Sequence, residues 1–289
     1  MTGSFRPFRW SELLRGTPVY AFEEFYVAKD VLLRYDERTG YLNYGWWEDG
    51  PSTPNPSAAL VARMLRSLAP GPGDVVLDVG SGLGQPAVDA ARATGARVVG
   101  VNRDPVQVEI ANARAAREGL ADRVRHRVLD ARALEELGDA RPTAAMFVES
   151  LAEMPDLPRV LAGLATVLPP GARVVACDVV RRPARGWRRA ASRALTAATS
   201  LLYGDAWRTP DELVAALEAA GFVDPRVESL GAEVYPETWR HARGRMGELR
   251  RRSAHAVTAG SLAWANLRGL DLLHRAGEVD YVLLSACRA

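Results

Sequence analysis

The sequence predicts an α/β protein with a Rossmann-like, mostly parallel sheet of seven strands and helices on both faces. Between residues 74 and 179, short strand-like segments alternate with helical segments, the order that places parallel strands side by side. These strand segments are almost continuously apolar, as expected of strands covered on both faces. The first strand passes through Asp78 into a glycine-rich turn, Gly80-Ser81-Gly82-Leu83-Gly84, and then into a helix.

The N-terminal part is rich in aromatic residues, and we expect it to form a cap that is helical around residues 21–35. A cluster of Gly, Pro and Ser at residues 50–56 interrupts regular structure. Apolar residues then recur at helical spacing from Ala59 to Leu68, and the Pro-Gly repeat at 70–73 stops this helix.

The alternating core follows directly. The predicted strands are 75–79, 97–101, 124–129, 144–148 and 173–179, and the predicted helices are 86–94, 105–118 and 157–168. Asp104 precedes Pro105 and is predicted to be the N-cap of its helix.

The last third departs from strict alternation. Thr209, Pro210 and Glu212 have the spacing of a capping box at the start of a helix. The other predicted elements are an amphipathic helix at 185–203, a strand at 226–230, a mostly helical stretch at 236–276 and a final strand at 280–286. Helices thus separate the last two predicted strands.

Composition excludes several classes of partner. The 37 basic and 35 acidic residues give a net charge of +2 and are scattered along the chain, so we expect no nucleic-acid partner. The sequence has two cysteines, no basic-apolar leader and no apolar run of membrane-spanning length. We therefore expect a cytoplasmic protein without a membrane partner. The oligomeric state stays open, a homodimer included.

The glycine turn has the spacing G-x-G-x-G, which differs from the G-x-G-x-x-G of dinucleotide-binding proteins. With Asp78 before it, the turn resembles motif I of the class I S-adenosylmethionine (SAM) methyltransferases. The resemblance implies SAM as the cofactor, with its amino-acid tail held by Asp78 and the backbone of Gly80, Gly82 and Gly84. A nicotinamide-dependent oxidoreductase is the least favoured alternative.

Two further segments extend the resemblance. The stretch 100–107 resembles a branch that includes cyclopropane fatty-acid synthases, tocopherol methyltransferases and sugar O-methyltransferases, which implies that Asn102 and Gln107 share the cofactor ribose. Asp130 and Ala131 follow the third strand, where the family binds adenine. Gln107 could instead be an exposed residue of a helix's first turn, and Asp130 an ordinary N-cap.

The segment Leu42-Asn43-Tyr44-Gly45-Trp46-Trp47 resembles the aromatic lid of these small-molecule enzymes. By that resemblance, Tyr44 and its neighbours close over the cofactor and the acceptor. The same aromatic residues could equally fill the protein core. The resemblance divides the single domain into a lid at 1–55, a SAM-binding core at 56–180 and an acceptor cap with the last strands at 181–289.

The segment 148–156 resembles the family's E-S-L-x-H-M-x-D sequence, but Glu153 stands where a histidine serves as general base. Asp178, at the end of the fifth strand, would lie beside Glu153 and could raise its pKa. Glu149 supports the loop or the cofactor by the same resemblance. His241, His255 and His274 are alternative bases, whereas His126 is predicted to be structural, and no histidine spacing indicates a metal site.

We therefore expect methyl transfer from SAM to a small, partly apolar secondary metabolite, with O-methylation favoured and C-methylation next. The departure at Glu153 leaves a second possibility, a SAM-bound enzyme that catalyses a non-methylating step such as cyclisation. A third is a SAM-binding subunit without catalysis.

Overall fold

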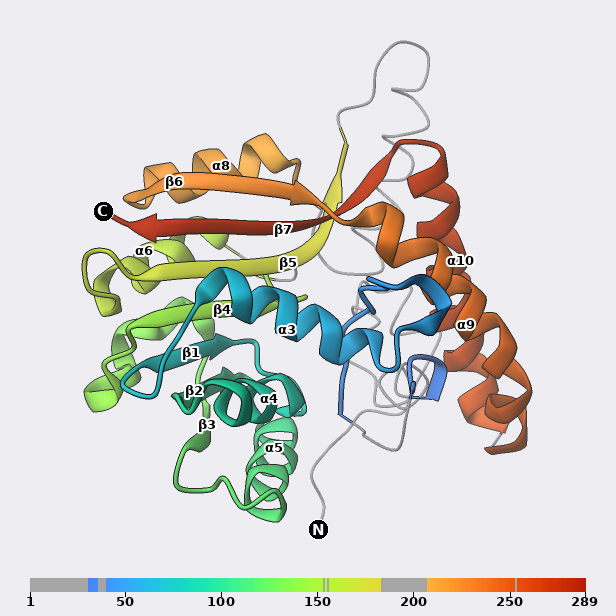
Figure 1. The fold of residues 1–289 in the computed structure, drawn as a ribbon, viewed down its shortest axis with the longest axis horizontal. Helices are drawn as coiled ribbons and strands as arrows, with labels where there is room; N and C mark the ends of the chain where they lie inside the picture. The colour runs from blue at the N-terminus through green and yellow to red at the C-terminus, as the bar shows by residue number, and fades with distance from the viewer. Residues whose placement is uncertain (1–30, 36–39, 153, 155, 183–206, 253) are drawn as a thin grey trace.

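The computed structural model describes residues 31–35, 40–152, 154, 156–182, 207–252 and 254–289. Seven strands form one sheet in the order β3-β2-β1-β4-β5-β7-β6 (Figure 1). The strands are β1 Val75–Val79, β2 Arg97–Asn102, β3 Val124–Val128, β4 Ala144–Val148, β5 Arg173–Arg181, β6 Phe222–Ser229 and β7 Val279–Arg288. Strands β1 to β5 are parallel, and β7 inserts antiparallel between β5 and β6. The predicted fold class is confirmed.

Helices cover both faces of this sheet. They are α3 Pro56–Leu68, α4 Gln85–Thr94, α5 Pro105–Arg117, α6 Leu157–Val167, α8 Pro210–Ala219, α9 Gly231–Arg252 and α10 Ala254–Arg275, with 3-10 helices η2 Gly50–Ser52 and η3 Ala131–Ala140. One apolar cluster packs α3, α4, α9 and α10 against the sheet, and a second packs η3, α6 and α8. Helices α9 and α10 lie side by side beyond the end of the sheet (Figure 1).

Side-chain caps fix where several helices begin. Asn55 caps α3 by accepting from the Ala58 amide, and Asp104 caps α5 by accepting from the Val106 amide. Thr209 and Glu212 form the reciprocal capping box of α8. The caps predicted at Asp104 and Thr209 are therefore confirmed.

Two boundaries differ from the sequence prediction. Strand β6 begins at Phe222, before Pro225, because a bulge between Val223 and Arg226 places the proline where its missing amide costs no ladder bond. Helix α9 begins at Gly231, so Pro236 lies inside the helix and does not start it. The residues before the proline, such as Tyr235, are held in helical conformation by burial in the core.

Part of the predicted structure lies outside the described residues: the helix at 185–203 and most of the helix at 21–35, of which Val31 and Leu32 are helical. In the described part of the chain, no helix has the length and apolar character needed to cross a membrane. Both cysteines are free thiols on neighbouring strands, Cys177 buried and Cys287 partly exposed.

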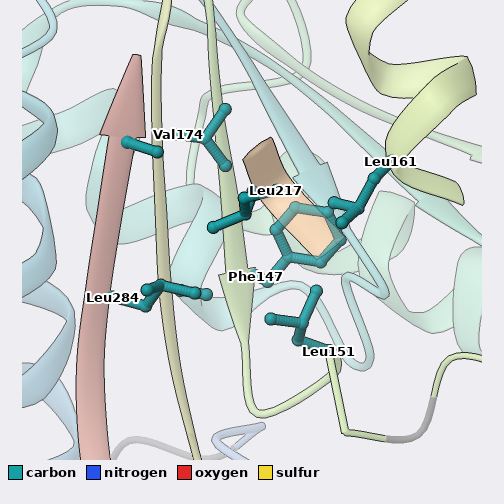
Figure 2. Close-up of a pocket in the computed structure, with 8 residues that line it drawn as sticks. Phe147, Leu151, Leu161, Val174, Leu217 and Leu284 are labelled. Atoms are coloured by element: carbon teal, nitrogen blue, oxygen red, sulfur yellow. The ribbon is translucent and has the colours of Figure 1, made fainter. Parts of the chain in front are cut away.

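A small apolar pocket lies between the sheet and the layer formed by α6 and α8 (Figure 2). All its lining residues are apolar: Phe147, Leu151, Leu161, Val174, Ala176, Leu217, Leu284 and Ala286. Because no polar group lines it to orient a ligand, we interpret it as imperfect core packing.

Candidate active site

Asp78 lies near the carboxyl end of β1, paired with Gly100 of β2 on one side and Met146 of β4 on the other. Its side chain is 1% exposed, and neither carboxylate oxygen has a hydrogen-bond partner among the described residues. Burial raises the pKa of this carboxyl to about 7. A buried carboxylate that lacks a hydrogen-bond partner among the described residues can bind a ligand that carries a positively charged donor.

The turn after β1 is shaped by glycines. Gly80, Gly82 and Gly84 adopt φ angles of +80°, +51° and +82°. A Cβ at Gly80 would lie 2.5 Å from the Cβ of Ser150, so the turn touches the loop after β4 directly. The amides of Gly80 and Ser81 both donate to the carbonyl of Val101, which fixes the turn against the end of β2.

Asn102 and Gln107 meet after β2. The Asn102 Nδ2 donates to Gln107 Oε1 at 3.0 Å, and the Asp104 amide donates to Asn102 Oδ1. Gln107 is buried, so it is not the exposed helix residue of the alternative interpretation. The structure thus brings together the two side chains expected to share the ribose, with amide groups able to donate and accept.

Asp130 and Ala131 follow β3 at the start of η3. Asp130 caps this helix, and its carboxylate also forms an ion pair with Arg132 at 2.7 Å. The hydrogen bond from Arg132 lowers the pKa of Asp130 to about 2. Asp130 is therefore the N-cap of the alternative interpretation, and an adenine amine would have to share its carboxylate with Arg132.

Glu149 connects three distant segments. Its Oε1 accepts from the amide of Tyr44 and, at 2.9 Å, from the hydroxyl of Tyr281 on β7. Glu149 has a positive φ of +51°, unusual for a residue with a Cβ and common at functional sites. Burial, and then the charge of Glu149, raise the pKa of the Tyr281 phenol well above its usual value.

Asp178 lies on β5, next to the same loop. Its Oδ2 accepts from the amide of Ala152 at 2.8 Å, and its Oδ1 accepts from the amide of Val179. Glu153 itself lies outside the described residues. Asp178 therefore holds the backbone of the residue that precedes the expected base.

Residues 40–47, which we call the strap, cross the glycine turn. The Leu42 side chain lies 3.2 Å from the position of a Cβ at Gly82. Trp47 donates from its indole to Thr238 of α9 at 3.1 Å, and Trp46 is buried in the core. The strap is thus anchored both to the cofactor turn and to the C-terminal helices, and its aromatic residues do fill the core.

The histidines have different surroundings. His126 is buried beneath the turn with Nδ1 3.0 Å from Ser81 Oγ, and burial lowers its pKa to about 4, in keeping with a structural role. His241 lies 3.0 Å from the carbonyl of Arg34, and His274 lies 3.3 Å from that of Val279. The side chain of His255 lies outside the described residues.

Sequence reasoning missed the contact of Tyr281 with Glu149 and that of Ser150 with the glycine turn. In the sequence, Tyr281 reads as an ordinary strand residue and Ser150 as a loop residue. Their roles depend on which strands become neighbours, and no local motif marks that.

The sheet, the glycine turn and the polar groups at the end of β2 are those of a Rossmann-like protein, a class that binds nucleoside-type cofactors at the carboxyl edge of its strands. One observation in particular indicates that these residues fit SAM. No described residue donates a hydrogen bond to the buried carboxylate of Asp78, and SAM carries an ammonium group that can do so.

Comparison with known proteins gives the same class. A family model for a methyltransferase domain matches residues 76–171. The 27-O-demethylrifamycin SV methyltransferase of Amycolatopsis mediterranei is 30% identical over 247 residues, which are 85% of this chain and 89% of that protein. The chain therefore belongs to the class I SAM-dependent methyltransferases, and SAM is its cofactor.

Two further relatives are similar to this chain. The methyltransferase GfsG of Streptomyces halstedii is 40% identical over 148 residues, which are 50% of this chain and 52% of GfsG, so the match spans about half of that relative. The crystal structure of the 4+2 cyclase SpnF is 25% identical with a TM-score of 0.72, covering 92% of this chain and 93% of that one.

Proposed function

We propose that this protein transfers the methyl group of SAM to a hydroxyl of a small, partly apolar secondary metabolite. The observation that carries the proposal is the contact of the glycine turn with the Glu149 loop, because it brings the cofactor and the candidate base segment to one edge of the sheet. The similarity to the rifamycin methyltransferase over most of both chains supports oxygen as the methyl acceptor.

Bound SAM supplies an electrophilic methyl group on a cationic leaving group. Asp78 binds the amino-acid tail beside Gly80, Gly82 and Gly84, and Asn102 with Gln107 binds the ribose. Asp130 and the backbone of Ala131 contact the adenine. The strap, through Tyr44, covers the cofactor and excludes water. The protein thus mainly aligns the reactants.

A hydroxyl acceptor must lose its proton, and we assign this step to Glu153. Asp178 holds the amide of Ala152 next to it, so Asp178 positions the base. Glu149 holds the strap closed during the reaction.

In this proposal residues 1–55 form the lid, 56–180 the SAM-binding core and 181–289 the acceptor cap. The acceptor is a small molecule and not a nucleic acid or a lipid bilayer. Trp239 and Trp264, packed edge to face at 4.9 Å between the cap helices, supply apolar surface of the kind that such an acceptor requires.

The test is an assay with SAM labelled in its methyl group and a panel of hydroxylated polyketides and terpenoids. We expect one labelled methyl per product and an equal amount of S-adenosylhomocysteine, with the label on oxygen. Label found on carbon would replace O-methylation by C-methylation, which needs less help from a base. Stoichiometric SAM binding without transfer to any acceptor would instead indicate a non-catalytic subunit.

A second candidate function is a SAM-bound, non-methylating cyclisation. The similarity to SpnF over nearly the whole of both chains favours it, together with the absence of histidine at Glu153. A cyclase would convert an acceptor into an isomer of equal mass without forming S-adenosylhomocysteine, so mass spectrometry of the same reactions separates the two functions.

A further inference from the structure

Arg114 reaches the glycine turn from helix α5. It is 6% exposed, and its Nε donates to the carbonyl of Leu83 at 2.9 Å. Its Nη1 donates to Oε1 of Gln85 at 3.0 Å. These two acceptors flank Gly84, so one guanidinium holds the end of the turn and the start of α4 together.

The same guanidinium contacts the strap. A Cβ at Gly40 would lie 2.2 Å from Nη2 and 2.4 Å from Cζ of Arg114. Gly40 also has a φ of +89°, which favours glycine. The strap therefore begins directly on the group that holds the turn.

A second series of hydrogen bonds also connects the strap to Arg114. Asp89 on α4 accepts from the hydroxyl of Tyr41 and, at 2.9 Å, from Nε2 of Gln85. Gln85 in turn accepts from Arg114. Strap, helix α4 and glycine turn thus form one connected polar network, and Arg114 contacts all three.

We propose that Arg114 is a positioning residue for cofactor binding, which locks the strap to the glycine turn so that SAM is held by both at once. The inference rests on the proposed function in that the turn and strap enclose SAM. Arg114 itself acts through Leu83 and Gly40. A lysine cannot replace it, because a single ammonium lacks the planar set of donors that reaches two acceptors and leaves a flat face for Gly40.

The first measurement is calorimetric binding of S-adenosylhomocysteine to the full chain carrying Arg114→Lys or Arg114→Ala. We expect the dissociation constant to rise at least about tenfold in both variants, since hydrogen bonds from a charged group are lost. Arg92→Ala is the matched control, because Arg92 forms an exposed ion pair with Glu118 and its loss should leave binding unchanged.

Hydrogen exchange separates positioning from folding. In the wild type, S-adenosylhomocysteine should slow exchange of the amides in residues 40–44. In Arg114→Lys this ligand-dependent protection should disappear while the protein stays folded by circular dichroism. A merely structural role for Arg114 would lower the melting temperature and leave the protection intact.

A double-mutant cycle with Gly40→Ala tests the contact itself. Gly40→Ala should weaken binding in the wild type but much less in Arg114→Ala, and the backbone strain at residue 40 cancels in the cycle. If Arg114→Ala does not fold, Arg114→Lys takes its place. Equal effects of Gly40→Ala in both backgrounds, or unchanged binding in Arg114→Lys, would overturn the role of Arg114 alone. Failure of the wild type to bind would overturn the proposed function as well.

Discussion

The hydroxyl of Tyr281 donates a 2.9 Å hydrogen bond to Glu149, and the same carboxylate oxygen accepts from the backbone amide of Tyr44. One oxygen therefore joins strand β7, the loop after β4 and the strap. Because both donors are uncharged, the attraction depends on the negative charge of Glu149. The position of the strap therefore depends on the charge of the Glu149 side chain.

Glu149→Gln keeps the shape of this contact and removes its charge. We expect SAM affinity to fall about three- to tenfold, as charged hydrogen bonds become neutral ones. Tyr281→Phe should have a smaller effect, because the bond to Tyr44 remains. Since burial keeps the Tyr281 phenol protonated, Tyr281→Phe should not move the pH profile of turnover. A shift of the basic limb of the pH profile in Tyr281→Phe would contradict the interpretation that the Tyr281 phenol stays protonated.

Asp178→Asn removes one of two carboxylate acceptors for backbone amides. An amide side chain offers one oxygen, so either Ala152 or Val179 loses its partner. We expect turnover to fall about tenfold or more while SAM affinity stays within about twofold. Steady-state kinetics with saturating SAM measure the first quantity and calorimetry the second. A change confined to SAM binding would argue against a role at the acceptor.

Asp78→Asn should have opposite effects on binding and stability. The thermal shift produced by SAM should shrink or disappear, because a neutral amide lacks the negative charge that pairs with the ammonium group. The carboxyl stays protonated in the folded protein up to about pH 7 but ionises near 3.8 when unfolded, so it costs stability as the pH rises through this window. The ligand-free variant should therefore be more stable than the wild type at pH 8, by on the order of 2–4 kcal/mol, in urea unfolding. Equal stability of the variant and the wild type at pH 8 would show that a hydrogen-bond donor reaches the Asp78 carboxylate in the wild type.

His126→Asn tests a residue whose effect on stability depends on pH in the opposite direction. Burial lowers the pKa of His126 to about 4, below its value of 6.5 when unfolded. The unfolded chain therefore binds a proton that the folded protein does not, and stability is lost as the pH falls from about 6.5 to 4. Over this range Asp78 acts in the other direction, whereas His241, whose pKa burial also lowers, acts in the same direction as His126. Removing His126 should therefore leave a protein that loses less stability on acidification than the wild type does, measured by unfolding at several pH values.

Leu217→Ala enlarges the apolar pocket in Figure 2 without touching the cofactor site. We expect a loss of about 2–5 kcal/mol in the free energy of unfolding, as for other buried leucines. SAM affinity should be unchanged at temperatures where the variant is folded. A parallel loss of affinity would mean that this layer of the core supports the site.

The sequence was sufficient to predict the strands of the parallel half and the caps at Asp104 and Thr209, because each has a strong local signal. It failed at β6, where Pro225 is accommodated by a bulge, and at α9, where burial outweighs Pro236. Both errors come from tertiary contacts that override local propensity.

In the candidate site, too, some residues are predictable from local sequence signals and others are placed only by tertiary contacts. Asp78 and Asn102 lie at the carboxyl ends of β1 and β2, and Gln107 follows shortly after β2. Neighbouring parallel strands bring such residues together at one edge of the sheet. Tyr281 could not be found in this way, because it comes from an antiparallel strand and reaches the site through its side chain. Arg114 could not be found either, since its partners, the carbonyl of Leu83, the side chain of Gln85 and the backbone at Gly40, lie far from it in sequence.

The placement of β7 between β5 and β6 also dictates an order of assembly. Among the described strands, β6 pairs only with β7, and a long pair of helices separates the two in the chain. During folding, β6 therefore gains this strand partner only when α9 and α10 have brought β7 back beside it. That closure joins segments far apart in sequence, which makes it a slow step and the point at which an unpaired edge is exposed to aggregation.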